Sequence, residues 1–410
     1  MKKLLLVLLI LSLFINHLNA NEKDLNIIQK DKKEYRLLDK ESIQTRQQSQ
    51  KYDWISPIDL SGNIGRNHSF SDENSRNLNN KNTKSASIGF TQSIFESGGI
   101  GFKMDYADNR FKYEMLSWEN QNSQLIYTIY NTLLDIKKLK LEINQNDYRI
   151  VNKDIELIIK KIQYEAGKTD IIELNNAIMS KNLILKEEIA LKNSLKEKEQ
   201  ELAKYTDLKY EDIEILDFQE TNKDIFLDKN YSILEADAKA EMLNSEYKIK
   251  KSQYLPKLSL SAKASYSNQD EKFNSMINDT NKDDATSSGS LILTMPLYDY
   301  TKSSKVQESK IEVLKQKSLV NDLKNETAYE YEQIFTKIDT YLKQNETINK
   351  NIKLYEELIG ANKISSEAGM TSKYDLEILE NTKTINEFDI LINKINILQQ
   401  YAKLYFKIKN

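Results

Sequence analysis

The sequence predicts a mostly α-helical protein with a small β part, built from duplicated helix–strand–strand–helix–helix units. Its three prolines are Pro57, Pro256 and Pro296, so the chain between 98 and 255 and the chain after 296 can run as very long helices. Six of the ten glycines fall between 62 and 101, which indicates a different kind of structure there. A third observation is that similar segments recur in the same order about 200 residues apart.

The N-terminus has the pattern of a secretory signal peptide. Lys2 and Lys3 precede an apolar run from Leu4 to about Ile15, and Ala20 is a small residue before a polar stretch. We expect residues 1–20 to be removed after Ala20. The alternative, an uncleaved anchor, is disfavoured because the run is short for a membrane-spanning helix.

The composition excludes several kinds of chemistry. The chain has no cysteine, which rules out disulfides, thiol catalysis and thiolate metal sites. Without Lys2 and Lys3, the chain has 57 basic and 62 acidic residues. This slightly negative net charge does not indicate a nucleic-acid-binding protein. His68 is the only histidine after Ala20, and we place it in a polar loop, where catalysis is not expected.

The repeated segments define the predicted domains. "YEAGKTDIIEL" at 164–174 returns as "SEAGMTSKYDL" at 366–376, and two further pairs of segments recur at nearly the same offset. We therefore expect a first structural repeat at 21–225 and a second at 226–410.

Each repeat contains two predicted strands after a short helix. The helices are expected at about 24–53 and 227–254, and polar loops at roughly 68–84 and 267–288. Apolar residues alternate with polar ones, as in Leu258, Leu260, Ala262, Ala264 and Tyr266. The strands are expected at about 56–66, 85–96, 256–266 and 289–299.

Two long helices follow the strands in each repeat. They are expected at about 102–165 and 171–205 in the first repeat, and at about 302–365 and 373–407 in the second. Apolar residues at spacings of three and four, as at Phe388, Leu391 and Ile395, are typical of a coiled-coil seam. A helix of ~64 residues would be ~96 Å long, more than a compact globular domain needs.

Strands with one apolar and one polar face are typical of an outer-membrane barrel wall. Lipid does not tolerate unpaired strand edges, and the smallest such barrels have about eight strands, so four strands cannot close alone. We expect several chains to contribute four strands each. The alternative is a soluble four-stranded sheet on a helical stalk.

The ordered set of segments resembles the TolC-type outer-membrane efflux protein family (outer membrane factors) over nearly all of the chain after Ala20. The segments are "YLPKLSLSA" (254–262), "LTMPLYDY" (293–300), "YEAGKTDIIELNNA" (164–177) and "SEAGMTSKYDLEIL" (366–379). The resemblance implies a homotrimer with a 12-stranded outer-membrane β-barrel and a long α-helical periplasmic tunnel. It also implies contact with outer-membrane lipid, a periplasmic adaptor (membrane fusion) protein, and an inner-membrane pump or ABC transporter. No catalysis, cofactor or metal is implied.

The repeated Glu-Ala-Gly segments predict two helix turns. Gly167 and Gly369 can adopt the left-handed conformation that ends a helix. Asp170 and Ser372 can cap the next helix, in capping-box-like pairs with Glu173 and Asp375. The turn residues are Ala166, Gly167, Thr169, Asp170, Ala368, Gly369, Thr371 and Ser372.

The resemblance places these turns at the periplasmic end of the tunnel, where helices converge on a gate. Asp375 then becomes the candidate gate residue, and Glu173 is its counterpart in the first repeat. Three copies of Asp375 would form a ring of negative charge, as in cation-selective constrictions. Lys168 and Lys373 are the basic residues available to pair with such an acid.

The function expected from this reading is an outer-membrane channel of a tripartite efflux or type I secretion system. The alternative is a secreted or surface coiled-coil structural or adhesin-like protein without a pore. An exported hydrolase is disfavoured because a nucleophile–base pair is missing. The aromatic residues beside the strands, such as Trp54, Tyr254 and Tyr298, could lie in a lipid headgroup belt or pack at the helix–strand junction.

Overall fold

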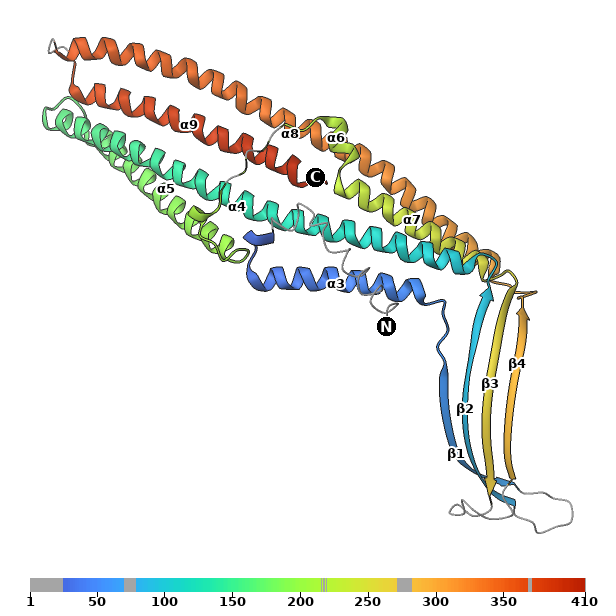
Figure 1. The fold of residues 1–410 in the computed structure, drawn as a ribbon. Helices are drawn as coiled ribbons and strands as arrows, with labels where there is room; N and C mark the ends of the chain where they lie inside the picture. Colours follow the sequence, from blue (N-terminus) through green and yellow to red (C-terminus); the bar gives the residue numbers. More distant parts are fainter. Residues whose placement is uncertain are drawn as a thin grey trace, which may run out of the picture. The chain divides into compact units, whose positions relative to one another are not determined.

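A computed structural model describes residues 25–69, 79–214, 216, 218, 220–270, 282–367 and 371–409. The predicted signal peptide at 1–20 lies outside these residues. The fold is mostly helical with one small sheet, as the sequence predicts (Figure 1). The elements are η2 Leu25–Ile27, α3 Lys30–Tyr52, β1 Asp59–Ser69, β2 Asn79–Phe95, α4 Gly99–Glu165, α5 Ile171–Ala203, η3 Tyr210–Asp212, α6 Lys223–Asp228, α7 Tyr231–Ser252, β3 Lys257–Asp270, β4 Lys282–Thr294, α8 Lys302–Glu367 and α9 Lys373–Phe406.

The chain forms two compact units. The first comprises residues up to Lys40, Leu116–Glu235 and Asn321–Asn410, and the second comprises Glu41–Met115 and Ala236–Val320. Among the helices of the described residues, none combines the length and the apolar character required to cross a membrane.

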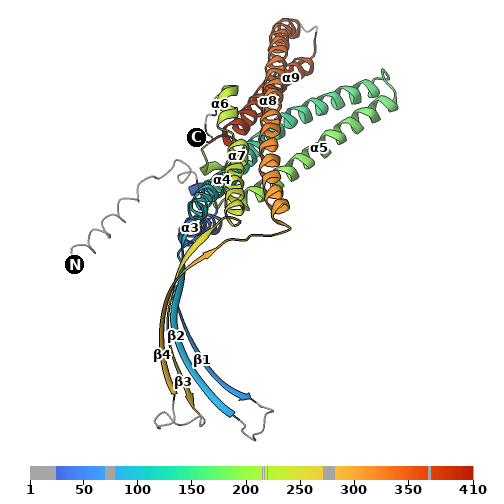
Figure 2. The same cartoon turned by 90° about the vertical axis from the view of Figure 1, so that its right-hand side faces the viewer.

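The second unit contains the whole sheet. The strands lie side by side in the order β1-β2-β3-β4, and every neighbouring pair is antiparallel (Figures 1 and 2). The central pair β2–β3 joins two strands whose closest ends, Phe95 and Lys257, are 162 residues apart along the chain (257 − 95). The two predicted strand pairs therefore build one continuous sheet.

The strand boundaries differ from those expected. β2 begins at Asn79 rather than near 85, and β3 extends to Asp270, so His68 and the expected loop residues 79–84 and 267–270 belong to strands, whereas 70–78 lie outside the described residues. These extensions are polar on both faces, so hydrophobic alternation gives no signal for them. β4 ends at Thr294 rather than 299, just before Pro296, which cannot donate a backbone hydrogen bond to a neighbouring strand.

A β-bulge in β2 changes which residue faces the apolar side. Ser93 pairs with Ser259, whereas Phe95 pairs with Leu258, so Ile94 is the inserted residue. The alternation that runs along β2 through Ile88 and Phe90 therefore breaks at the bulge, and Phe95 takes the position in register with Leu258.

The first unit contains two helical hairpins, α4 with α5 and α8 with α9. A buried cluster of Phe226, Ile334, Ile338, Leu404 and Ile408 packs α6, α8 and the C-terminal residues together. Aromatic rings extend this packing, since Phe218 lies 5.8 Å from Tyr130 and 5.5 Å from Phe406 between ring centroids. Burial of these large side chains is the main stabilising term for such long helices.

A buried guanidinium fixes the start of α3 to α4 within this first unit. Arg36 donates from Nε to Asn122 Oδ1 at 2.6 Å and from a terminal nitrogen to the Trp118 carbonyl oxygen at 3.0 Å. Trp118 Nε1 donates in turn to the Arg36 carbonyl oxygen at 2.8 Å. The burial lowers the pKa of Arg36, while the Asp39 carboxylate opposes that shift.

Candidate functional site

The sheet has one continuous apolar face. Cross-strand pairing places Leu60, Ile88, Ala264 and Ser287 in one row. Because side chains alternate along each strand, every second row lies on the same face of the sheet. The large members of this face are exposed: Ile58, Leu60, Ile64, Ile88, Phe95, Leu260, Tyr266, Leu291 and Leu293. Leu60 is 80% exposed and Leu293 72%, so this apolar face has no covering partner among the described residues.

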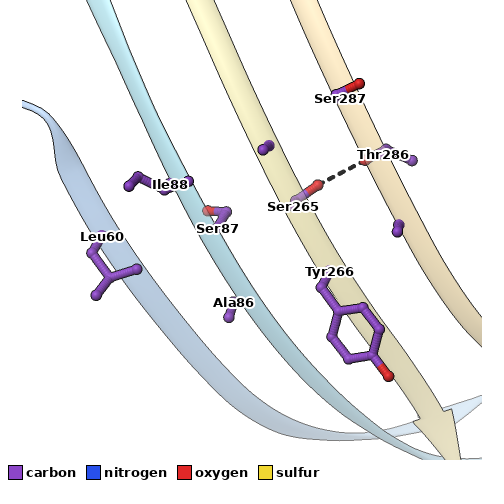
Figure 3. A pocket seen from close by; sticks show the side chains of 10 residues that line it. Leu60, Ala86, Ser87, Ile88, Ser265, Tyr266, Thr286 and Ser287 are labelled. Carbon is purple, nitrogen blue, oxygen red and sulfur yellow. Dashed lines mark hydrogen bonds between the residues drawn. The ribbon is translucent and has the colours of Figure 1, made fainter.

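The opposite face carries hydroxyl groups that bond to one another. Ser61 and Ser87 lie 2.8 Å apart between hydroxyl oxygens, and Ser265 and Thr286 lie 2.7 Å apart. Figure 3 shows the second bond, which joins β3 to β4; Leu60 on β1, Ile88 on β2 and Tyr266 on β3 line a hollow of the sheet. Thr91–Ser261 at 3.0 Å and Ser93–Ser259 at 3.3 Å continue the series.

The sheet does not close within the described residues. β2 and β3 are paired on both sides, but β1 and β4 each have one edge that pairs with no other strand of the described chain. These edges present rows of backbone N–H and C=O groups, which require partners wherever water is excluded.

A buried carboxylate holds the junction between the sheet and the helices of its unit. Glu96 follows β2 and is 6% exposed. One oxygen lies 2.9 Å from Lys103 Nζ on α4, and the other lies 3.5 Å from Lys257 Nζ at the start of β3. Substitution of Glu96 should destabilise this junction, because both Lys103 and Lys257 would lose their counter-charge. Sequence reasoning missed Glu96, since its partners are brought together only by the β2–β3 pairing.

The turn between α4 and α5 ends the first helix with a left-handed glycine. Gly167 has φ 69°, and its N–H donates to the Tyr164 carbonyl oxygen at 2.9 Å. The Lys168 N–H donates to the Gln163 carbonyl oxygen at 2.8 Å. This pair of bonds is the Schellman motif, which satisfies carbonyl groups that the helix end leaves without partners.

The next helix begins with the predicted cap. Asp170 Oδ1 accepts a hydrogen bond from the Glu173 N–H at 2.9 Å. The side chain of Glu173 does not complete a capping box. Its Oε2 lies 3.0 Å from Lys160 Nζ, across the turn on α4. The basic partner is therefore Lys160 rather than Lys168, because antiparallel packing places the preceding turn of α4 opposite Glu173.

Three further ion pairs connect α4 to α5. Asp154 pairs with Lys181 at 2.5 Å, Arg149 with Glu187 at 3.4 Å, and Asp135 with Lys198 at 3.4 Å. The acidic partner alternates between the two helices along the hairpin. Each exposed pair contributes little to stability, but the set favours one antiparallel register over its neighbours.

The second predicted turn is described only in part. Ala368 and Gly369 lie outside the described residues. Ser372 is the N-cap of α9, and its hydroxyl accepts from the Tyr374 N–H at 3.1 Å. Thr371 donates from its hydroxyl to the Asn362 carbonyl oxygen at 3.3 Å, which ties the turn to α8.

Asp375 lies in the first turn of α9 and is exposed. Within the described residues its carboxylate forms no ion pair, and Lys373 beside it lies 5.7 Å from the centroid of the Tyr374 ring. The two hairpins end on the same side of the first unit in both views (Figures 1 and 2). Glu173 and Asp375 thus differ: the first is held by a lysine, and the second is not paired in this part of the chain.

The comparisons with known proteins agree with this geometry. The family model for the outer membrane efflux protein matches residues 224–403. Residues 224–403 are thus similar to the outer membrane efflux protein family. The predicted family resemblance is therefore confirmed, and the matched efflux-protein segment contains β3, β4 and the α8–α9 hairpin with Asp375.

Solved structures extend the likeness of fold to both halves of this chain. The outer membrane protein VceC of Vibrio cholerae matches with a TM-score of 0.73 at 11% identity, covering 93% of this chain and 94% of VceC. The CmeC outer membrane channel of Campylobacter jejuni matches with a TM-score of 0.70 at 14% identity, covering 93% of this chain and 86% of CmeC. The open-state MtrE outer membrane channel of Neisseria gonorrhoeae matches with a TM-score of 0.65 at 11% identity, covering 94% and 88%. A comparison with curated proteins found no match.

Proposed function

We propose that the chain is the outer-membrane channel component of a tripartite efflux or type I secretion system. It provides a passive, gated exit duct across the periplasm and the outer membrane, and carries out no reaction itself. The observation that carries this proposal is the two-faced, unclosed sheet in a chain whose second half matches the efflux protein family.

The apolar face has the height of a membrane. From Leu258 to Tyr266 there are eight residue steps on β3, or ~27 Å along the strand and ~20 Å along the membrane normal at a tilt of ~40°. This is close to the ~25 Å apolar band of outer-membrane barrels. Beyond Tyr266 the same face turns polar, where Asn268 donates to Asp283 at 2.6 Å.

Exposed aromatic residues lie at the other end of the strands. Tyr298 and Tyr300 are each 86% exposed and Tyr52 62%. This exposure favours the headgroup belt over packing for these three residues, because a tyrosine ring with a polar hydroxyl suits the membrane interface. The sheet thus spans the outer membrane, and the long helices extend into the periplasm.

Closure of the sheet requires further copies of the chain. Because each chain has four strands, an even number, β1 and β4 run in opposite directions. β4 of one copy can therefore pair antiparallel with β1 of the next copy. Three copies give twelve strands, within the range known for outer-membrane barrels. We propose this homotrimer, with the apolar face toward lipid and the hydroxyl face toward the interior.

The hairpin ends form the periplasmic tip, and Asp375 is the proposed gate residue. Its exposed carboxylate lacks an ion pair in the described residues, whereas Glu173 is held by Lys160. A periplasmic adaptor and an inner-membrane pump or ABC transporter would supply the energy and open the tip.

The experiment is purification of the full chain from outer membranes into detergent, followed by native mass measurement and planar-bilayer recording. We expect a trimer that inserts and conducts ions. A secreted coiled-coil protein without a pore, the alternative, would leave the apolar face of Leu60 and Leu293 in water. A soluble, monomeric and non-conducting chain would favour that alternative and overturn the channel.

A further inference from the structure

The polar face of the sheet carries very few charges. Its rows from Ser93–Ser259 to Asn63–Ser85 consist mainly of serine and threonine, and the hydroxyl pairs described above satisfy one another. Three side chains in these rows are charged: Asp59, Lys263 and Asp284. Lys263 is the one cation among them, and all three are exposed.

Asp59 and Lys263 occupy the same cross-strand row. Asp59 pairs with Gly89, and Gly89 pairs with Lys263, so a glycine lies between the two charges. A Cβ on Gly89 would lie 3.0 Å from the Ala262 carbonyl oxygen and 3.3 Å from both Cβ and Cγ of Lys263. The stem of Lys263 therefore lies against the gap that Gly89 leaves in β2.

The ammonium group of Lys263 forms no ion pair within the described chain. No carboxylate of the described residues lies within 4.0 Å of Lys263 Nζ, in contrast to Lys257, which bonds Glu96 at the top of the same strand. Asp59 is two strands away, or ~10 Å at the usual strand spacing. At that distance the two charges attract each other weakly, and both act on ions that pass near the wall.

A closed barrel brings this lysine close to every passing ion. Twelve strands spaced ~4.8 Å apart and tilted ~40° have a backbone radius of ~12 Å. A lysine side chain reaches roughly 6 Å, so its charge lies ~6 Å from the axis, which is less than the Debye length of ~10 Å at 0.1 M salt. The charge of Lys263 therefore acts on an ion that crosses the barrel.

We propose that Lys263 sets the ionic selectivity of the barrel interior. This inference rests on the proposed channel. In each copy Lys263 opposes Asp59 and Asp284, so the wall of a trimer carries a net charge of about −3 on these residues rather than −6. The lysine keeps the hydroxyl-lined wall close to neutral, which suits a duct that passes solutes of either sign.

The test is the reversal potential of single trimers in a tenfold KCl gradient, for the wild type, Lys263→Gln, Asp59→Asn and Lys84→Gln. Lys263→Gln should raise the K⁺ to Cl⁻ permeability ratio at least about twofold, and Asp59→Asn should lower it. Lys84 lies on the same sheet but belongs to the apolar face, in the row of Ile64, so its substitution should leave the ratio unchanged.

A second measurement covers the case in which the tip controls the current. Because the chain has no cysteine, Lys263→Cys provides a unique thiol. Labelling it with a cationic methanethiosulfonate should restore the wild-type ratio, and labelling with an anionic reagent should raise the ratio further. A thiol that is labelled without any change in selectivity overturns the proposal, as does an unreactive thiol. A wild-type chain that does not conduct at all would instead refute the channel itself.

Discussion

Lys160 Nζ lies 3.0 Å from Glu173 Oε2, across the turn that joins α4 to α5. The pair connects the last turns of one helix to the first turn of the next, beside the Gly167 turn and the Asp170 cap. Local backbone conformation and charge pairing therefore act on the same segment, residues 160–173.

The Asp170 cap should control local opening of the first turn of α5. Asp170→Ala removes the acceptor of the Glu173 N–H and should cost about 1 kcal/mol. Hydrogen exchange of residues 171–174 in the full chain should accelerate roughly fivefold. Asp170→Asn keeps an acceptor and is the control; equal acceleration in both variants would contradict the cap.

Gly167 is required for its backbone angle and not for space. Nothing lies within 4 Å of a Cβ placed there, yet its φ of 69° costs about 1 kcal/mol or more for an L side chain. Gly167→Ala should lower the thermal midpoint of the purified protein. Gly360, inside α8, is equally open, so Gly360→Ala is the matched control and should stabilise by about 0.5 to 1 kcal/mol. The same sign of change in both variants would refute this interpretation.

Glu330 should make stability depend on pH. Burial disfavours its charged form, but hydrogen bonds and charges from Lys403 and Lys407 outweigh burial and hold the pKa of Glu330 below its ordinary value. A lowered pKa in the folded chain means that this stabilisation is present above the unfolded value of ~4.3 and is lost as the pH falls through the folded value.

Glu330→Gln should therefore destabilise the protein at pH 7 by about 1 to 2 kcal/mol, and by much less near pH 3. The measurement is denaturant unfolding at both pH values. Glu332→Gln is the control, because Glu332 pairs with Lys223 on the surface, with 62% of its side chain exposed. A pH-independent loss in Glu330→Gln would show that packing, rather than charge, stabilises this site.

The two faces of the sheet should tolerate charge differently. Leu291→Arg places a cation on the apolar face and should cost about 2 kcal/mol or more in the membrane, so fewer trimers should appear in the outer-membrane fraction. Ser290→Arg adds the same charge on the opposite face of the same strand and should assemble normally. Equal assembly of both variants would mean that the apolar face does not contact lipid.

Asp375 should bind multivalent cations at the proposed gate. Asp375→Asn removes the charge without changing the size of the side chain, and should weaken block by a trivalent cation at least tenfold in planar bilayers. Glu380→Gln, on the same helix, is the control because it also removes one exposed carboxylate. Unchanged block in Asp375→Asn would remove this residue from the gate.

The sequence by itself determined the local features of this protein. Alternation of Leu258, Leu260 and Tyr266 with polar residues defined the two faces of a strand, since that period reflects backbone geometry alone. Proline-free tracts indicated the long helices, and Asp170 and Gly167 indicated a cap and a turn, because these signals depend on a few neighbouring residues.

Only the tertiary structure decided which distant residues meet. The bulge that brings Phe95 opposite Leu258, the Lys160–Glu173 pair, and the Glu96 contacts to Lys103 and Lys257 all join elements that the sequence separates. No local pattern encodes such partners, because many lysines and acids compete for each contact until packing selects one register. For the same reason the strand ends at Asn79 and Asp270, which lack an apolar face, became visible only through their pairing with neighbouring strands.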